Sequence, residues 1–341
     1  MKGLIVPELG KLELVYDIPE PEMGPYDAIV QVVSCGICNG TDTKVIEGHF
    51  KGFDTYPCVL GHEACGKIIA VGDKVRNFKV GDYVLRAKLR DSDKYYHGWG
   101  GFSERALVTD YFARVEDGEK GVPVSHMAEQ IVPPDIDPVK AMMIITLKEV
   151  FSALNQFGVK EGKKVMINGC GPVGQAMVRF CKLLGVNGLI VSDLDEERLK
   201  KAQRLGADVL INPAKQDVVS AVKAVYPSGV DLFIDAVGIN SLINTGFQVI
   251  KFNGKICVYG ISPKTCAEID WEKAPYNWNI QFVQKPTFPE EYAVHNRVVE
   301  FVRSGAINLD DFVSHVLPVE AFEEGFRLSR SKQATKVALT F

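Results

Sequence analysis

Residues 1–115 show short apolar and β-branched runs separated by glycine, proline and aspartate, a pattern typical of strands joined by turns. The clearest runs are 28–33, 67–71 and 83–85. This pattern predicts an all-β or barrel-like domain. A proline-rich stretch at 131–138 then precedes a change of pattern, and we place a domain transition soon after it.

From residue 163 onward, apolar strands alternate with amphipathic helices. Strands are expected at 164–168, 188–192, 208–211, 230–235 and 255–259. One helix is predicted from the helical spacing of Val173, Met177, Phe180 and Leu184, and another over 196–205, ended by Gly206. Nearly all-apolar strands that alternate with helices predict a parallel sheet covered on both faces, so the expected fold class is α/β.

The bulk composition narrows the possible functions. The 341 residues are about two domains long, and a net charge of -4 without a Lys/Arg-rich run argues against a nucleic-acid partner. No apolar run approaches the roughly 20 residues that span a bilayer, and the N-terminus does not have the pattern of a signal peptide. We therefore expect a cytoplasmic protein with no membrane partner. Its eight cysteines are then expected to be free thiols or metal ligands rather than disulfides.

A glycine-rich turn joins the first strand of this second region to its helix. Gly169, Gly171 and Gly174 form a GxGxxG element between strand and helix, the context in which it binds a dinucleotide. The first glycine allows the tight turn, the second lets the backbone approach the pyrophosphate, and the third allows close helix–strand packing. Pro172 and Val173 belong to the same element, whose helix N-terminus favours phosphate.

Asp193 ends the next strand, 19 residues after Gly174, where a carboxylate would bind the ribose 2′-hydroxyl. The same charge would repel the 2′-phosphate of NADP, so NAD is the expected cofactor, although Arg198 is close enough to bear on that preference. The alternative is a glycine-rich loop in a doubly wound sheet that binds another ligand or none.

Two short segments carry side chains that bind zinc. Residues 35–42 contain Cys35 and Cys38, and residues 61–66 contain His62, Glu63 and Cys65. Thiolate, imidazole and carboxylate all bind zinc, and a catalytic site needs three protein ligands and an open position. One alternative is buried cysteines with a core histidine. Another is a structural zinc knuckle made of Cys35, Cys38, Cys58 and Cys65.

Over essentially its full length the chain resembles the medium-chain, zinc-dependent alcohol dehydrogenase family. The residues that carry the resemblance are 36–38, Thr41-Asp42, 61–63 with Gly66 and Gly72, 81–84, 100–105, the glycine-rich turn, 314–318 and 336–341. The resemblance implies a GroES-like catalytic domain of residues 1–145 and 289–341. It also implies a Rossmann domain of residues 146–288 that binds NAD.

The resemblance also implies one catalytic zinc per chain, bound by Cys38, His62 and Glu63. Thr41 would bond the substrate hydroxyl and begin the proton relay, and Asp42 would orient His62. Asn39 makes the separation of Cys38 and Thr41 one residue longer than is usual in the family.

Several positions depart from the family pattern. The usual late zinc ligand falls near Ile144 and Ile145, which cannot bind metal, so Glu63 takes that role with Glu149 as an alternative. The four-cysteine structural lobe is missing, because residues 66–169 contain no cysteine. Lys44 occupies the position of the relay histidine. His49 is expected in a solvated loop, with a substitute relay role as the alternative if that loop folds back, and His97 is expected at the surface or in the pocket wall. Phe50, Tyr56 and Trp99 are candidates for the substrate pocket or the core.

The missing lobe and the His62-Glu63 pair resemble polyol-type members, so the expected reaction is the reversible oxidation of a polyol, sugar or cyclitol to a ketone. Alternatives are a simple or amino alcohol as substrate, a zinc-free reductase of the same superfamily, and a non-catalytic nucleotide-responsive protein. Residues 279–283 resemble the family's edge strand that pairs across a dimer, which implies a homodimer or homotetramer.

Overall fold

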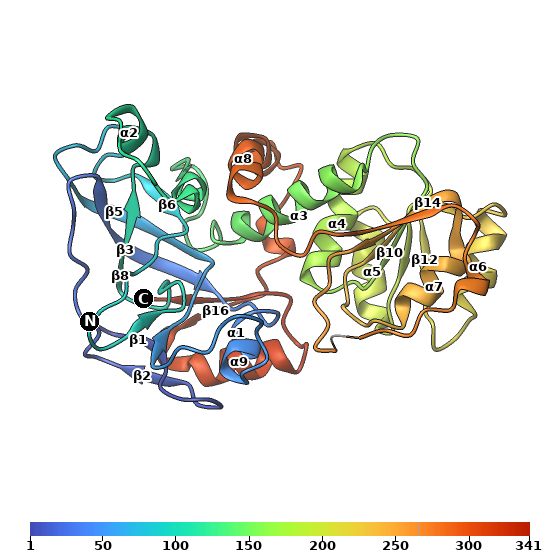
Figure 1. Ribbon diagram of the computed structural model, residues 1–341, viewed down its shortest axis with the longest axis horizontal. Coiled ribbons are helices and arrows are strands. Elements are labelled where there is room, and N and C mark those ends of the chain that lie inside the picture. Colours follow the sequence, from blue (N-terminus) through green and yellow to red (C-terminus); the bar gives the residue numbers. More distant parts are fainter. Residues whose placement is uncertain (265) are drawn as a thin grey trace. The chain divides into compact units, whose positions relative to one another are not determined.

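The computed structural model describes residues 1–264 and 266–341, which divide into two compact units (Figure 1). The terminal unit comprises Met1–Lys148 and Thr287–Phe341, and the central unit comprises Glu149–Pro286. Helix α3 (Met143–Phe157) contributes residues to both units. The predicted fold class, a β-rich unit together with a parallel-sheet α/β unit, is confirmed.

The terminal unit contains two sheets. The four-stranded sheet has the order β2–β1–β4–β7, with β1 Gly3–Val6, β2 Glu13–Val15, β4 Cys58–Val59 and β7 Tyr96–His97. The seven-stranded sheet has the order β16–β17–β3–β5–β6–β9, and β8 pairs with β3. Its strands are β3 Asp27–Gly36, β5 Ala64–Val71, β6 Tyr83–Leu85, β8 Arg105–Thr109, β9 Ile131–Val132, β16 His315–Pro318 and β17 Val337–Thr340.

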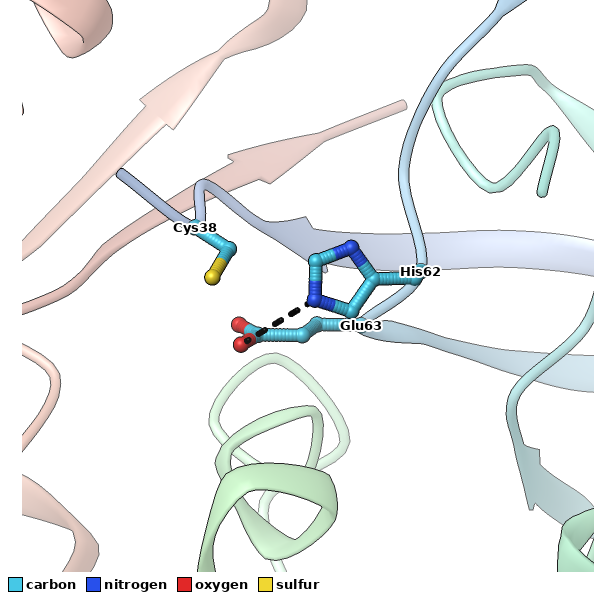
Figure 2. Close-up of side chains that lie close together, drawn as sticks. All are labelled: Cys38, His62 and Glu63. Carbon is cyan, nitrogen blue, oxygen red and sulfur yellow. Dashed lines mark ion pairs between the residues drawn. The ribbon is translucent and has the colours of Figure 1, made fainter. Parts of the chain in front are cut away.

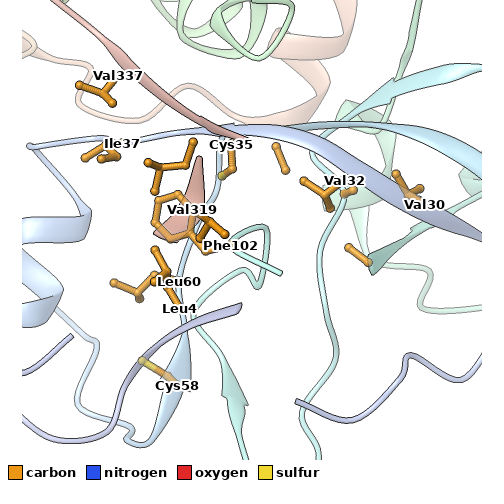
Figure 3. Packing of buried hydrophobic residues seen from close by; sticks show 14 of the residues in the cluster. Leu4, Val30, Val32, Cys35, Ile37, Cys58, Leu60, Phe102, Val319 and Val337 are labelled. Atoms are coloured by element: carbon orange, nitrogen blue, oxygen red, sulfur yellow. The ribbon is translucent and has the colours of Figure 1, made fainter. Parts of the chain in front are cut away.

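Four helices and three 3-10 turns lie within the described part of the terminal unit, beside the start of α3. They are α1 Asp42–Ile46, α2 Tyr111–Glu116, α8 Phe288–Arg303 and α9 Phe322–Arg330, with 3-10 turns at Val124–Ala128, Leu309–Asp311 and Val319–Ala321. Alternate residues of β3 (Ala28, Val30 and Val32) are buried, as the period of two in a strand requires. They belong to one apolar core that also contains Leu4, Leu60, Phe102 and Val319 (Figure 3).

The central unit is built on a six-stranded sheet of order β12–β11–β10–β13–β14–β15, in which every pairing is parallel. Its strands are β10 Val165–Asn168, β11 Ile190–Ser192, β12 Val209–Ile211, β13 Val230–Asp235, β14 Ile250–Val258 and β15 Trp278–Phe282. Its helices are α4 Pro172–Leu183, α5 Glu196–Leu205, α6 Val218–Val225 and α7 Leu242–Val249, with a 3-10 turn at Trp271–Lys273. The strand order reverses between β10 and β13, and ligands bind at such switch points.

The sequence pattern located most elements of the central unit. Helix α5 and strand β13 have the predicted bounds, and Met177 and Phe180 of α4 are buried. Strand β14 begins five residues earlier than predicted, because Lys251 and Asn253 are polar, Phe252 is exposed and Asn253 has a positive φ of 61°. Such residues interrupt the apolar pattern of a strand without ending its pairing.

None of the eight cysteines, all of which the structure describes, forms a disulfide, in agreement with the expectation of thiols or metal ligands rather than disulfides. Seven of them are buried or half-buried, and Cys266 is exposed. Within the residues that the structure describes, no helix combines the length and the apolar character needed to cross a membrane.

Candidate metal centre and dinucleotide site

The turn after β3 places Cys38 beside Thr41. The backbone N–H groups of Thr41 and Asp42 donate to the carbonyl of Cys38 at 3.1 and 2.8 Å, and the Cys38 N–H donates to Asp42 Oδ2 at 2.8 Å. The additional residue, Asn39, is held within the turn by the Thr43 hydroxyl, which donates to Asn39 Oδ1 at 3.0 Å. The Thr41 hydroxyl therefore lies 3.7 Å from the Cys38 sulfur despite the longer separation.

The segment before β5 holds His62 and Glu63 by its backbone. The carbonyls of Leu60 and Gly61 accept from the N–H groups of Phe102 and Gly101 at 2.9 and 2.8 Å. The Glu63 carbonyl accepts from the Gly36 N–H at 3.0 Å, which joins this segment to the end of β3. This pairing brings the two sequence segments that carry Cys38 and Glu63 together.

Cys38, His62 and Glu63 lie with their donor atoms within 4.8 Å of one another (Figure 2). His62 Nδ1 is 3.6 Å from Asp42 Oδ1, which is beyond hydrogen-bond distance, and neither of these buried atoms has a hydrogen-bond partner among the described residues. The other ring nitrogen, Nε2, is 3.8 Å from Glu63 Oε1. The imidazole therefore has one nitrogen toward Asp42 and the other toward Glu63, an arrangement that suits a metal at Nε2.

Glu63 also has two partners that the sequence did not predict. The Lys336 ammonium donates to its two carboxylate oxygens at 2.8 and 2.7 Å, and the Thr146 hydroxyl donates to Oε1 at 2.9 Å. All three side chains are buried. A carboxylate offers roughly four lone-pair positions, so three hydrogen bonds leave room for a metal. Apart from its place in segment 336–341, which carries the family resemblance, the sequence signal for Lys336 is a lysine directly before an apolar strand.

The electrostatics of this pocket favour added positive charge. Burial would raise the pKa of Glu63, but Lys336 and His62 outweigh it and hold the pKa below its usual value. Burial would lower the pKa of His62, but the neighbouring Asp42 carboxylate and Cys38 outweigh it and raise the pKa. The buried carboxylates of Asp42 and Glu63 thus lie beside the Lys336 ammonium, the His62 imidazole and the Cys38 thiol, and the donor set of thiol, imidazole and carboxylate fits zinc.

The other candidates from the sequence lie in different settings. Ile144 and Ile145 are fully buried, and Glu149 is not part of the metal-binding group. Among the described residues that group is also the only one of its kind, so the four-cysteine knuckle is not formed. His49 and His97 are exposed, as expected, and lie 3.8 Å from Glu47 and Asp91 respectively.

An aromatic cluster borders His62. The Trp99 ring lies 5.2 Å from the imidazole, and the rings of Phe50 and Phe53 lie 6.0 and 6.1 Å from Trp99. Trp99 has a positive φ of 74°, and Tyr56 packs against Phe53 at 6.0 Å. These half-buried rings form one side of the candidate metal centre.

The glycine-rich turn of the central unit has the geometry that dinucleotide binding requires. Gly169 has a φ of 101°, and a Cβ at Gly174 would lie 1.8 Å from the Gly169 carbonyl oxygen. A Cβ at Gly171, by contrast, would meet no protein atom within 4 Å. The fold itself therefore requires the first and third glycines, whereas the second leaves the front of the loop open to a ligand. Pro172 begins α4 directly behind it.

Asp193 lies beside this turn at the carboxyl end of β11. Its Oδ2 accepts from the Cys170 N–H at 2.6 Å, and its Oδ1 accepts from the Asp195 N–H at 2.9 Å. Asp195 caps α5, and the guanidinium of Arg198 lies 3.9 Å from it. The carboxylate is thus held at the turn, where it can accept a hydrogen bond from a ribose hydroxyl.

Known proteins share both parts of this arrangement. A family model described as "Alcohol dehydrogenase GroES-like domain" matches residues 24–117, which include Cys38, His62 and Glu63. Another, described as "Zinc-binding dehydrogenase", matches residues 172–285, which include Asp193. Together they cover more than half of the chain.

Curated relatives and solved structures match over nearly the full length. The L-threonine 3-dehydrogenase of Symbiobacterium thermophilum is 29% identical and the match covers 99% of this chain and 97% of that protein. That of Shewanella woodyi is 26% identical, with 95% of each chain covered. The structure of 2R,3R-butanediol dehydrogenase from Bacillus subtilis has a TM-score of 0.82 at 22% identity and covers 100% of this chain and 99% of that one, which shows the same fold.

Proposed function

The chain belongs to the medium-chain, zinc-dependent alcohol dehydrogenase family and is an oxidoreductase, and on this premise we propose that it oxidises a secondary alcohol to a ketone with NAD. The observation that carries the proposal is the group of Cys38, His62 and Glu63 within 4.8 Å in the terminal unit. A dinucleotide turn with an acidic residue beside it, in the central unit, supports the same reaction.

Cys38, His62 and Glu63 would hold one zinc ion per chain. When bound, zinc supplies Lewis acidity that lowers the pKa of an alcohol at the open position. Asp42 would hold the Nδ1–H of His62, so that Nε2 is free to bind the metal. Lys336 and Thr146 would fix the direction of the Glu63 carboxylate and offset part of its charge.

Thr41 is our candidate for the first step of proton transfer. Its hydroxyl lies 3.7 Å from the Cys38 sulfur and is half-buried, so it can contact both a substrate at the metal centre and solvent. A hydroxyl can accept the alcohol proton while it donates its own. Hydride transfer to the nicotinamide is then the chemistry of the cofactor, which the protein positions.

The cofactor preference depends on Asp193. Gly169, Gly171 and Gly174, with Pro172 and Val173 at the start of α4, would bind the pyrophosphate, and Asp193 would bind the ribose. We predict that Asp193→Ala weakens NADH binding by about 1.5–3 kcal/mol and narrows the preference over NADPH, because a charged hydrogen bond is lost. Fluorescence titration with both cofactors measures this. The control is Asp195→Ala, which removes a cap of α5 two residues away; equal effects of the two variants would remove Asp193 from this role.

For the substrate we propose a polyol, sugar or cyclitol. The names of the relatives, L-threonine 3-dehydrogenase and 2R,3R-butanediol dehydrogenase, describe molecules that carry a secondary hydroxyl, which supports a ketone product. The curated relatives also favour a second candidate, an amino alcohol such as L-threonine.

A substrate panel tests the proposal. NADH formation is measured with polyols, cyclitols, L-threonine and simple alcohols, with and without a strong zinc chelator. Turnover of one class that the chelator abolishes is the expected result. Turnover that the chelator leaves unchanged would indicate a zinc-free reductase, and NAD binding without any turnover would indicate a nucleotide-responsive protein.

We further propose a cytoplasmic homodimer or homotetramer. Strand β15 is an edge of the central sheet, and its residues Ile280 and Phe282 are exposed, as is the nearby Tyr276. An open edge with apolar side chains can pair with a second copy. Light scattering coupled to size-exclusion chromatography gives the molar mass of the assembly. Ile280→Lys is expected to shift it toward the monomer, and an unchanged mass would exclude this edge as the interface. Cysteines that form no disulfide are typical of a reducing compartment, which supports the cytoplasmic location.

A further inference from the structure

Arg86 has a backbone conformation that is unusual for its residue type. It follows directly after β6 and has a φ of 60°, in the left-handed region that glycine adopts without strain. A residue other than glycine is strained in this region and stays there only where surrounding contacts hold it. The contacts of Arg86 must therefore offset this strain.

Those contacts reach the segment that carries the proposed metal ligands. The Arg86 N–H donates to the carbonyl of Ala64 at 2.8 Å, and its Nη1 donates to the carbonyl of His62 at 3.4 Å. The neighbouring carbonyls of Gly61 and Glu63 accept from backbone N–H groups instead. Of the three consecutive carbonyls of Gly61, His62 and Glu63, the His62 carbonyl is thus the one that accepts from a side chain. His62 is also the residue whose ring would bind the metal.

The guanidinium is itself fixed by a buried carboxylate. Arg86 Nε and Nη2 donate to the two oxygens of Glu291, on α8, at 2.7 Å each. Such a bidentate pair sets the plane of the guanidinium as well as its distance. Lys148, fully buried on α3, lies 3.1 Å from the same carboxylate. Burial would raise the pKa of Glu291, but Arg86 and Lys148 outweigh it and lower the pKa.

We propose that Arg86 is a positioning residue of the metal centre. Its guanidinium, oriented by Glu291, holds the carbonyl of His62 and so fixes the direction in which the imidazole faces Cys38 and Glu63. This inference rests on the proposed zinc site. The inference extends the metal centre beyond its three ligands and Asp42. Through Arg86 it links the His62 carbonyl to Glu291 of α8.

The charges around Glu291 allow a variant of Arg86 that does not leave this glutamate without a cation. Arg86 and Lys148 give two positive charges around one carboxylate, so Arg86→Met leaves a buried Lys148–Glu291 pair rather than an uncompensated anion. Methionine also retains much of the aliphatic part of the arginine. Arg86→Lys keeps the charge but cannot form the bidentate pair and reach His62 together.

The experiment measures metal binding directly. Zinc affinity is determined by competition with a chromogenic chelator, and the absorption spectrum of the cobalt-substituted protein reports the ligand geometry. Arg86→Met is expected to weaken zinc binding by about 10- to 100-fold, the effect of losing a group that orients a ligand, and to shift the cobalt bands. Arg86→Lys is expected to recover part of the affinity.

The matched control is Arg90→Met, which makes the same exchange four residues further on and removes a pair with Asp27 at 2.7 Å. It should leave zinc affinity and the cobalt spectrum as in the wild type. If Arg86→Met lowers Tm but binds zinc and cobalt like the wild type, Arg86 only stabilises the fold and the inference is overturned. A failure of the proposed metal centre itself is distinguishable, because the wild type would then bind no zinc.

Discussion

Two of the buried glutamates in the terminal unit, Glu63 and Glu291, differ in what surrounds them. Glu63 and Glu291 are 1% and 2% exposed, and each lies within hydrogen-bond distance of a buried lysine. Glu291 has a second cation, Arg86, on both of its oxygens. Glu63 has Lys336 on both of its oxygens, and in place of a guanidinium it faces the Cys38 thiol and the His62 imidazole.

This difference separates a structural ion cluster from a site that can bind a cation. Around Glu291 two positive charges face one negative charge, so a further cation would be repelled. Around Glu63 the carboxylate of Asp42 adds a second negative charge, and Asp42 Oδ1 and His62 Nδ1 are buried without a hydrogen-bond partner among the described residues. Both glutamates are therefore buried charges. The Glu63 pocket differs from the Glu291 cluster in its second carboxylate and in its thiol and imidazole, which are zinc ligands.

Removing the thiol from the Glu63 pocket should have the largest effect. Cys38→Ser is expected to abolish zinc binding and turnover while NADH binding stays near normal, because the dinucleotide turn belongs to the other unit. Elemental analysis and NADH fluorescence measure the two properties. The control Cys266→Ser changes an exposed thiol and should bind zinc normally. Zinc retained by Cys38→Ser would show that the ligands around Asn39 are wrongly assigned.

Removing the lysine from each cluster tests the comparison directly. Lys336→Met is expected to lower the free energy of unfolding of the metal-free protein by about 3–5 kcal/mol, because it leaves Glu63 buried without its cation. Lys148→Met should lower the free energy of unfolding by less, because Arg86 still binds both oxygens of Glu291. Denaturant unfolding measures both.

Added zinc sharpens this test. Zinc should recover much of the stability lost in Lys336→Met, because a divalent ion at Cys38 and His62 would replace the missing charge beside Glu63. It should stabilise Lys148→Met no more than it stabilises the wild type. If zinc acts equally on the two variants, the clusters do not differ in the way proposed here.

A further effect, expected only in acid and small near neutral pH, comes from the histidine beside the Glu291 cluster. Burial, with a contribution from Lys148, lowers the pKa of His295 to about 3, against an ordinary value near 6.5. Between these values the unfolded chain binds more protons at this position than the folded one. Stability should therefore fall as the pH is lowered from about 6.5 toward 3, by at most about 1.4 kcal/mol per pH unit.

The variant His295→Gln should reduce this slope, since glutamine does not titrate but can still donate to the Ile131 carbonyl that His295 Nε2 contacts at 2.9 Å. Denaturant unfolding at a series of pH values gives the slope. The control His49→Gln changes an exposed histidine and should leave the slope unchanged. An equal slope in wild type and His295→Gln would exclude His295 as a source of acid sensitivity.

The sequence determined the elements and the local motifs because both depend on residues near one another in the chain. Alternating burial along β3 and the helical spacing of Met177 and Phe180 follow from the period of each element. The glycine turn and Asp193 could be located because a strand, a turn and a helix in succession fix their order. Family resemblance, rather than local pattern, supplied the roles of Cys38 and His62.

Only the tertiary structure decided which charges meet in the interior. Lys336 lies 273 residues from Glu63 in the chain, and Glu291 lies 205 residues from Arg86. No periodicity or spacing in the sequence links such positions, because their contact depends on how separate strands and helices pack. The sequence therefore predicts that these side chains are present, whereas the packing of distant elements decides that one glutamate has surplus positive charge and the other faces a thiol and an imidazole.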